Sequence, residues 1–239
     1  MTAPLLRLKG VSIGAGHPLT TIVRGVTFDV YPGERVYLVG HTGAGKTTLL
    51  LGIYGARQLI QGSIEFLDMK LSRRRVPPME RWRYSMGFSF QDQRLLPHKT
   101  VEENVAIPLE VRGIYGTEQT VKVQRVLDIV GLLDRRRDYP TMLSGGERQL
   151  VSLARAVVHG PRLILADEPM AGLDNITALR VLRTLERVHE ELNITMIIAT
   201  HNIEMISRRA TRVVKLSRGR IVADMYGRSE VYEEYSETF

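Results

Sequence analysis

A glycine-rich stretch, GHTGAGKT, has the residue types and the spacing of a phosphate-binding loop. It fits the pattern G-x-x-x-x-G-K-[ST], and it lies between an apolar run typical of a strand and a pattern typical of a helix. The glycines let backbone amides approach phosphate oxygens, Lys46 is expected to reach the β- and γ-phosphates of a nucleotide, and Thr47 offers a hydroxyl to Mg²⁺. The predicted nucleotide contacts are Gly40, His41, Thr42, Gly43, Ala44, Gly45, Lys46, Thr47 and Thr48.

Two adjacent carboxylates, Asp167 and Glu168, follow the apolar run LILA at 163–166. Such a run predicts a buried strand, and ligands bind at the carboxyl ends of strands in parallel sheets. Two neighbouring carboxylates are costly there unless they share a cation or a proton. We expect Asp167 to bind Mg²⁺ and Glu168 to orient or deprotonate an attacking water. The alternative is a surface acidic pair at the end of a strand.

The stretch LSGGERQ at 143–149 is a second candidate anion site. Ser144, Gly145 and Gly146 open a predicted helix, whose unpaired amides and partial positive charge suit an anion. One nucleotide has no need of two phosphate sites in the same chain. The pattern therefore raises the question of which molecule the second site serves.

Around these motifs, the hydrophobic pattern alternates between strands and helices. Strands are predicted at 5–13, 22–30, 35–39, 62–68, 86–91, 162–167 and 195–200, with a hairpin over 212–225. Helices are predicted at 46–55, 101–113, 121–135, 145–160, 175–192 and 203–210. One helical face is formed by Val123, Val126, Leu127 and Val130. The alternation predicts a mostly parallel sheet covered by helices.

Composition narrows the class of protein. The 239 residues are 44% hydrophobic and 25% charged, as in soluble globular proteins that bury a core. The chain has no cysteine, which excludes disulfides, zinc–thiolate sites and a cysteine nucleophile. No apolar run approaches the ~18 residues of a membrane span, and the first residues lack the order of a signal peptide. We therefore expect a cytosolic location, and attachment to a membrane would need a partner.

The net charge of +7 is compatible with nucleic acid, an anionic membrane face or phosphate ligands. The arginines form short clusters at 73–75, 135–137 and 208–209, which we interpret as solvated loops and helix ends. The acidic stretch EVYEEYSETF at 230–239 argues against a basic nucleic-acid-binding tail.

With these motifs in order, the chain resembles the ATP-binding-cassette (ABC) ATPases over nearly its whole length. LSGGE at 143–147 is similar to the family's signature motif, and AGLD at 171–174 is similar to its D-loop. Gln91 in FSFQD resembles the glutamine of the Q-loop, and His201 in IIATHN resembles the switch histidine.

The resemblance implies a P-loop fold, with a mostly parallel core sheet, an N-terminal antiparallel β subdomain and an inserted helical subdomain at about 93–159. The remaining ranges, 1–92 and 160–239, would form the core and the β subdomain. The resemblance also implies a head-to-tail homodimer in which Ser144, Gly145, Gly146 and Asp174 reach the nucleotide bound by the partner. Hydrolysis of ATP would use Glu168, His201, Gln91 and Lys46, with Mg²⁺ held by Thr47, Gln91 and Asp167. Asp174 could also be only a helix cap.

Two positions depart from the family pattern. In many members, an aromatic residue near the N-terminus stacks on adenine. This chain has Ala15 at that position, and no Tyr or Phe precedes Phe28. Adenine binding would then depend on His17 or on aliphatic contacts, and the preference of the chain for ATP or GTP stays open. After the signature, Leu150 stands where a basic residue is common.

Within the family, GHTGAGKTTLL, FQDQRLLPHKTVEENVAIPL and ATHNIEMISRRATRV most resemble the cell-division branch. The resemblance implies a motor subunit at the cytoplasmic face of a bacterial inner membrane, with an integral membrane subunit docked near residues 92–113. Local packing of Leu95, Leu96 and Pro97 is the alternative to docking. Other functions left open are an exporter for lipoproteins or macrolides, a nucleotide-dependent scaffold, and a nucleic-acid-acting ATPase. No nucleic acid is expected, because the chain lacks sustained heptads and zinc modules.

Overall fold

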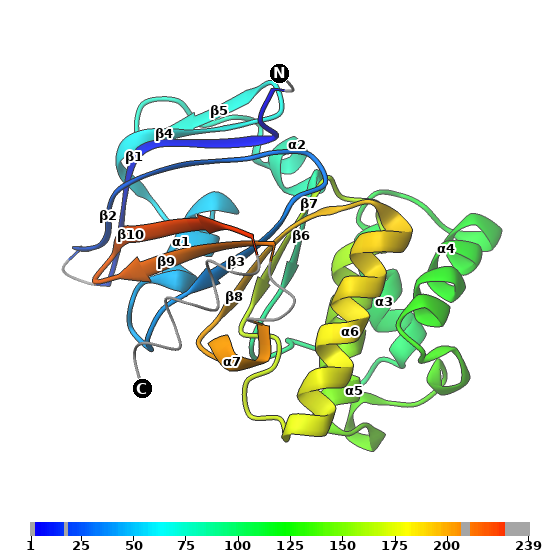
Figure 1. Cartoon of the computed structure of the whole chain (residues 1–239). Coiled ribbons are helices and arrows are strands. Elements are labelled where there is room, and N and C mark those ends of the chain that lie inside the picture. Colours follow the sequence, from blue (N-terminus) through cyan, green and yellow to red (C-terminus); the bar gives the residue numbers. More distant parts are fainter. Residues whose placement is uncertain (1–2, 17–18, 207–210, 228–239) are drawn as a thin grey trace. The chain divides into compact units, whose positions relative to one another are not determined.

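The structure, a computed structural model, describes residues 3–16, 19–206 and 211–227 (Figure 1). Its internal contacts divide the chain into two compact units. The first unit comprises Met1–Arg83 and Thr195–Phe239, and the second unit comprises Tyr84–Ile194.

The first unit contains an antiparallel sheet in the order β2-β1-β4-β5. Its strands are β1 (Leu6–Ala15), β2 (Thr20–Val30), β4 (Leu59–Phe66) and β5 (Met69–Ser72). The central strand β1 pairs with both β2 and β4, and it buries Leu6, Leu8 and Ile13 completely. Helix α1 (Lys46–Ile53) approaches β1 closely, since Ile13 Cδ1 lies 2.2 Å from where a Cβ on Gly52 would stand. An apolar sheet face covered by a helix is the core of this part.

Four strands of the mostly parallel core sheet also lie in the first unit, in the order β10-β9-β3-β8. They are β3 (Arg35–Val39), β8 (Thr195–Thr200), β9 (Arg212–Ser217) and β10 (Arg220–Tyr226). Strand β3 runs parallel to β8 and β9, whereas β9 and β10 form an antiparallel hairpin. All residues of β8 are buried, as expected for a strand covered on both faces. Helix α7 (Ile203–Ile206) follows β8, and α2 (Met79–Tyr84) ends at the unit boundary.

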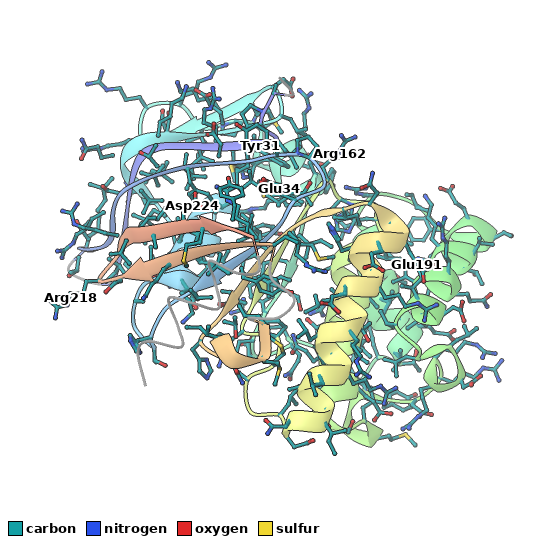
Figure 2. The ribbon with its side chains drawn as sticks, in the orientation of Figure 1. Tyr31, Glu34, Arg162, Glu191, Arg218 and Asp224 are labelled. Atoms are coloured by element: carbon teal, nitrogen blue, oxygen red, sulfur yellow. The ribbon has the colours of Figure 1, made fainter. Side chains whose placement is uncertain are left out.

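Arg212, at the start of β9, is 4% exposed and ties β9 to three other segments of the first unit. Its guanidinium donates to the carboxylate of Asp224 at 2.8 and 2.9 Å, to Glu34 at 2.9 Å and to the backbone oxygen of Asp29 at 2.8 Å. Glu34 also accepts from the backbone N–H of Tyr31, and Figure 2 labels Tyr31, Glu34 and Asp224. A buried cation with these partners avoids the large penalty of an uncompensated charge.

The second unit combines two parallel strands with helices. The strands are β6 (Met86–Ser89) and β7 (Leu163–Asp167), and the helices are α3 (Val101–Glu110), α4 (Gly116–Ile129), α5 (Gly145–Val157) and α6 (Asn175–Leu192), with short 3₁₀ turns at Leu133–Arg135 and Pro140–Met142. Capping boxes begin α3 and α5, where Thr100 and Ser144 each exchange hydrogen bonds with a glutamate three residues on. Local sequence thus fixes where these two helices begin.

His159, just after α5, is a neutral structural residue of the second unit. Its Nε2 lies 3.1 Å from the backbone oxygen of Met86, so this nitrogen donates. Among the described residues, its buried Nδ1 has no hydrogen-bond partner. Burial, helped by the positive charge of Arg112, lowers the pKa of His159 to about 4.

The predicted fold class is confirmed, and so is the buried face of Val123, Val126, Leu127 and Val130. Other boundaries differ. The helix predicted at 121–135 spans Gly116–Ile129, because its first turn is polar and Gly131 adopts a positive φ just after its end. Strand β5 and helix α2 were not predicted, since both are too short to show a period. Residues 207–210 of the last predicted helix lie outside the described residues.

Candidate nucleotide-binding site

The glycine loop lies in the first unit between β3 and α1, as its motif predicts. Gly45 is the N-cap of α1 with φ 105°, a conformation that favours glycine. Gly40 passes close to β9, because a Cβ there would stand 2.3 Å from the backbone oxygen of Leu216. The turn between β9 and β10 fastens the loop through a hydrogen bond of 2.9 Å from Gly219 N to Ala44 O. Neighbouring strands therefore shape the loop as much as its own sequence does.

Lys46 begins α1 and is only 6% exposed. Its Nζ donates to the backbone oxygen of Gly40 at 2.7 Å and lies 3.4 Å from that of His41. The ammonium therefore lies over the loop, where a bound phosphate would gain a cation together with the amides of the helix N-terminus. The next residue, Thr47, is exposed in the first turn.

His201 lies at the same sheet edge as the glycine loop. Strands β3 and β8 are parallel neighbours, and Val39 is in register with Thr200. Gly40 and His201, the next residues, therefore leave adjacent strands side by side. His201 is exposed, and the turn after it is held by a bond of 3.1 Å from Asn202 N to the hydroxyl of Thr200. The first unit thus brings the switch histidine candidate to the carboxyl edge that carries the loop.

The second unit has an equivalent edge, formed by β6 and β7. Ser89 pairs in register with Ala166, so Gln91 and Asp167 both emerge at the carboxyl ends of parallel strands. Gln91 is exposed, whereas Asp167 is 4% exposed. A carboxylate at this position and the hydroxyl of Thr47 are hard oxygen donors, the type that Mg²⁺ prefers. The residues predicted to hold the metal therefore fit it chemically.

Glu168 adopts an unusual backbone conformation, with φ 46°. The left-handed region costs a residue with a side chain about 1–3 kcal/mol, so the surrounding chain must hold it there. One such contact is the bond of 3.0 Å from Ala171 N to Glu168 O. Strain of this kind clusters at functional sites, which agrees with a reactive role for this glutamate.

The second glycine motif opens α5, as predicted. The hydroxyl of Ser144 accepts from Glu147 N at 3.3 Å, and Ser144 N donates to the Glu147 carboxylate at 2.8 Å. The backbone hydrogen bond from Ser144, the largest cause, lowers the pKa of Glu147. Gly146 packs against α6, where Thr177 Cγ2 lies 2.2 Å from the place of a Cβ. Leu150, the departure noted in the sequence, is 1% exposed and belongs to the apolar core.

Asp174 is the N-cap of α6, and one of its carboxylate oxygens accepts from Ile176 N and Thr177 N at 3.0 Å each. A hydrogen bond from the side chain of Thr177, the largest cause, lowers the pKa of Asp174. The capping role is therefore present in the structure. At the adenine position, Ala15 ends β1, and His17 lies outside the described residues.

Sequence reasoning missed a polar cluster beside the Gln91 loop, formed by Ser89, Gln149 and Ser152 with Arg155 nearby. A signal was available, because Gln149 and Ser152 are polar residues at helical spacing on an otherwise apolar face of α5. Their hydrogen-bond partners could not be predicted from the sequence. Among the described residues, no helix is both long and apolar enough to cross a membrane.

The chain is similar in sequence and in fold to known proteins. Residues 23–171 match the family model described as ABC transporter. The chain is 44% identical over 202 residues to the cell division ATP-binding protein FtsE of Escherichia coli K12, covering 83% of this chain and 89% of that protein. The FtsE protein of Bacillus subtilis is 39% identical over 202 residues, with coverage of 84% and 88%. A dimeric post-hydrolysis structure of the ATP-binding cassette MJ0796, bound to ADP and Pi, has a TM-score of 0.81 at 28% identity, covering 92% of this chain and 98% of that one.

Proposed function

Because the chain belongs to the ABC transporter family of ATP-binding proteins, which hydrolyse ATP, we propose that it is the ATPase of an FtsE-like cell-division complex. In this proposal it dimerises on ATP and drives an integral membrane subunit similar to FtsX, and the complex of the two regulates septal peptidoglycan hydrolysis. The observation that supports this is the 44% identity to FtsE over 83% of the chain.

The hydrolytic roles that we propose belong to residues at the two strand edges. Lys46 binds the β- and γ-phosphates, and Thr47, Gln91 and Asp167 hold Mg²⁺, which neutralises charge on these phosphates when bound. Glu168 orients the attacking water and accepts its proton. His201 contacts the γ-phosphate from the end of β8.

We also propose that 93–159 acts as the helical subdomain, with 1–92 and 160–239 as the core and β subdomain.

A homodimer explains why the chain has two glycine motifs. The amides at the start of α5 face the γ-phosphate of ATP held by the partner molecule, together with Ser144, Gly145, Gly146 and Asp174. The dimeric MJ0796 cassette supports this, because a relative of the same fold pairs in its ADP- and Pi-bound state. Loss of the γ-phosphate would remove the charge shared by both molecules and loosen the dimer.

The membrane subunit would dock near residues 92–113. This segment contains the loop after β6 and helix α3, and it exposes 36% of Leu96 and 64% of Val111. Leu96 follows Gln91 closely in the sequence, and an exposed apolar side chain there suits a partner that must respond to the γ-phosphate. The protein would then act at the cytoplasmic face of a bacterial inner membrane, held there by its partner.

The cellular role can be tested by depletion and complementation. Depletion should give filamentous cells, wild-type protein should restore division, and Lys46→Ala should not. Affinity capture of the wild-type protein should recover an integral membrane protein with a large extracytoplasmic loop. If division continues normally and lipoprotein release or macrolide export fails instead, the protein acts as a LolD- or MacB-like ATPase and the cell-division proposal is wrong.

Dimer formation has a separate test. Ser144→Arg should block ATP-dependent association and leave monomer binding of ATP unchanged, because Arg fills the helix N-terminus with bulk and charge. Arg125→Met, which changes an exposed cation on α4, is the matched control. Sedimentation in the Glu168→Gln background, where ATP persists, gives the readout. An unchanged dimer in Ser144→Arg would contradict the proposed contact.

A further inference from the structure

The turn that follows Gln91 is strained. Gln93 and Arg94 have φ values of 53° and 49°, so two consecutive residues with side chains occupy the left-handed region. This conformation is unfavourable for a residue with a side chain, because its Cβ comes too close to the following carbonyl oxygen. Local bonds support the turn: Arg94 N donates to Asp92 O at 2.6 Å, and the Gln93 side chain donates to Gln91 O at 3.2 Å. Two strained residues in a row nevertheless need support from outside the turn.

Arg155, on α5, supplies that support. One guanidinium nitrogen donates to the backbone oxygen of Arg94 at 2.7 Å, and the other donates to that of Gln93 at 2.5 Å. The planar fork of arginine suits two neighbouring carbonyls, which a lysine could not bridge in the same way. Burial, the largest cause, and the positive charge of Arg94 both lower the pKa of Arg155, so the cation is held here against an electrostatic cost.

The same face of α5 is joined to β6, the strand that leads to Gln91. Gln149 Nε2 donates to the hydroxyl of Ser89 at 3.2 Å, and this hydroxyl lies 3.3 Å from that of Ser152. One turn further along α5, Ala156 O lies 2.0 Å from where a Cβ on Gly87 would stand. Helix and strand therefore touch through their backbones. Because α5 starts at the signature glycines, one rigid element connects these glycines to the Gln91 turn.

We infer that Arg155 is a positioning residue for ATP hydrolysis, which fixes the course of the Gln91 turn from the signature helix through the carbonyls of residues 93 and 94. The inference rests on the proposed role of Gln91 at the γ-phosphate and Mg²⁺. Arg155 acts through the backbone of the turn, and its loss frees Gln91 without removing any group that binds nucleotide.

The test compares Arg155→Met and Arg155→Lys with the exposed control Arg125→Met. Arg155→Met should lower kcat for ATP hydrolysis by at least ~10-fold and leave the Kd for ATP within about twofold, as for a group that matters after binding. The kcat of Arg155→Lys should lie between those of Arg155→Met and wild type, because a single ammonium can hold one carbonyl. Arg125→Met should match wild type. A kcat for Arg155→Met equal to that of the control would overturn the inference.

A double-mutant cycle with Gln91→Ala separates positioning from general damage to the fold. If Arg155 acts through Gln91, then Arg155→Met should lower kcat little or not at all once Gln91 is already alanine. An equal fall in both backgrounds would overturn the inference, because the effect would bypass Gln91. A normal kcat for Gln91→Ala alone would instead refute the proposed role of Gln91. Thermal unfolding of each variant, including the conservative Arg155→Lys, shows whether a lower kcat reflects unfolded protein.

Discussion

Gly146, in the signature motif, has a packing role that can be separated from any contact with nucleotide. An alanine Cβ at this position would lie 2.2 Å from Thr177 Cγ2 on α6. Carbon atoms pack at about 3.5–4.0 Å, so the two groups would overlap by more than ~1 Å. Gly146→Ala therefore forces the start of α5 away from α6 or turns Thr177 out of its rotamer.

The size of the effect follows from two opposing contributions. Overpacking of this kind costs about 1–3 kcal/mol, whereas replacing a helical glycine with alanine stabilises by about 0.5–1 kcal/mol. The difference is a net loss of about 0–2.5 kcal/mol, with a central value of about 1.25 kcal/mol. At about 2–4 °C per kcal/mol for a chain of this length, Tm should fall by about 2.5–5 °C, measured by differential scanning calorimetry. Thr177→Ser provides the matched variant, because it removes Cγ2 and keeps the hydroxyl that hydrogen-bonds Asp174.

The double variant Gly146→Ala/Thr177→Ser should recover most of the lost Tm. A Tm for Gly146→Ala at or above that of wild type would refute the steric argument, as would a double variant no more stable than the single one. Once stability is restored, sedimentation with ATP becomes informative about function. If the double variant regains its stability and still does not dimerise with ATP, Gly146 has a second role at the nucleotide of the partner.

Three further predictions concern other sites. Glu168→Gln should keep ATP binding and slow turnover by at least ~100-fold, which phosphate release measures; normal turnover would remove Glu168 from the role of base. Gly87→Ala should lower Tm more than Gly146→Ala, because the obstacle 2.0 Å away is the backbone oxygen of Ala156 and not a side-chain methyl; an equal or smaller shift would show that β6 can move. The folded pKa of His159, about 4, lies below its ordinary value of 6.5, so the unfolded chain binds the proton first and stability falls as pH drops from 6.5 to about 4. Between these pH values the free energy of unfolding of His159→Gln should fall by about 3 kcal/mol less than that of wild type. Identical pH profiles of unfolding for the two proteins would contradict the lowered pKa of His159.

The order of motifs along the chain was enough to predict the fold class, because each motif carries its own local context. The glycine loop is confirmed between a strand and a helix, and the Ser144 and Asp174 caps begin the helices that their sequences indicate. These features depend on residues within a few positions of each other. Short elements such as β5 and α2 could not be predicted, since four to six residues show no period.

The amino-acid sequence by itself determined which residues could bind phosphate, hold a metal and activate water, because residue type and spacing set that chemistry. Only the tertiary structure decided that β3 and β8 place Gly40 beside His201, that Glu168 is strained, and that Thr177 occupies the space beside Gly146. It also decided that Arg155 reaches the carbonyls of a turn more than sixty residues earlier in the chain. The reason is that register, close approach and strain arise between segments far apart in sequence, whereas a sequence pattern records only neighbours.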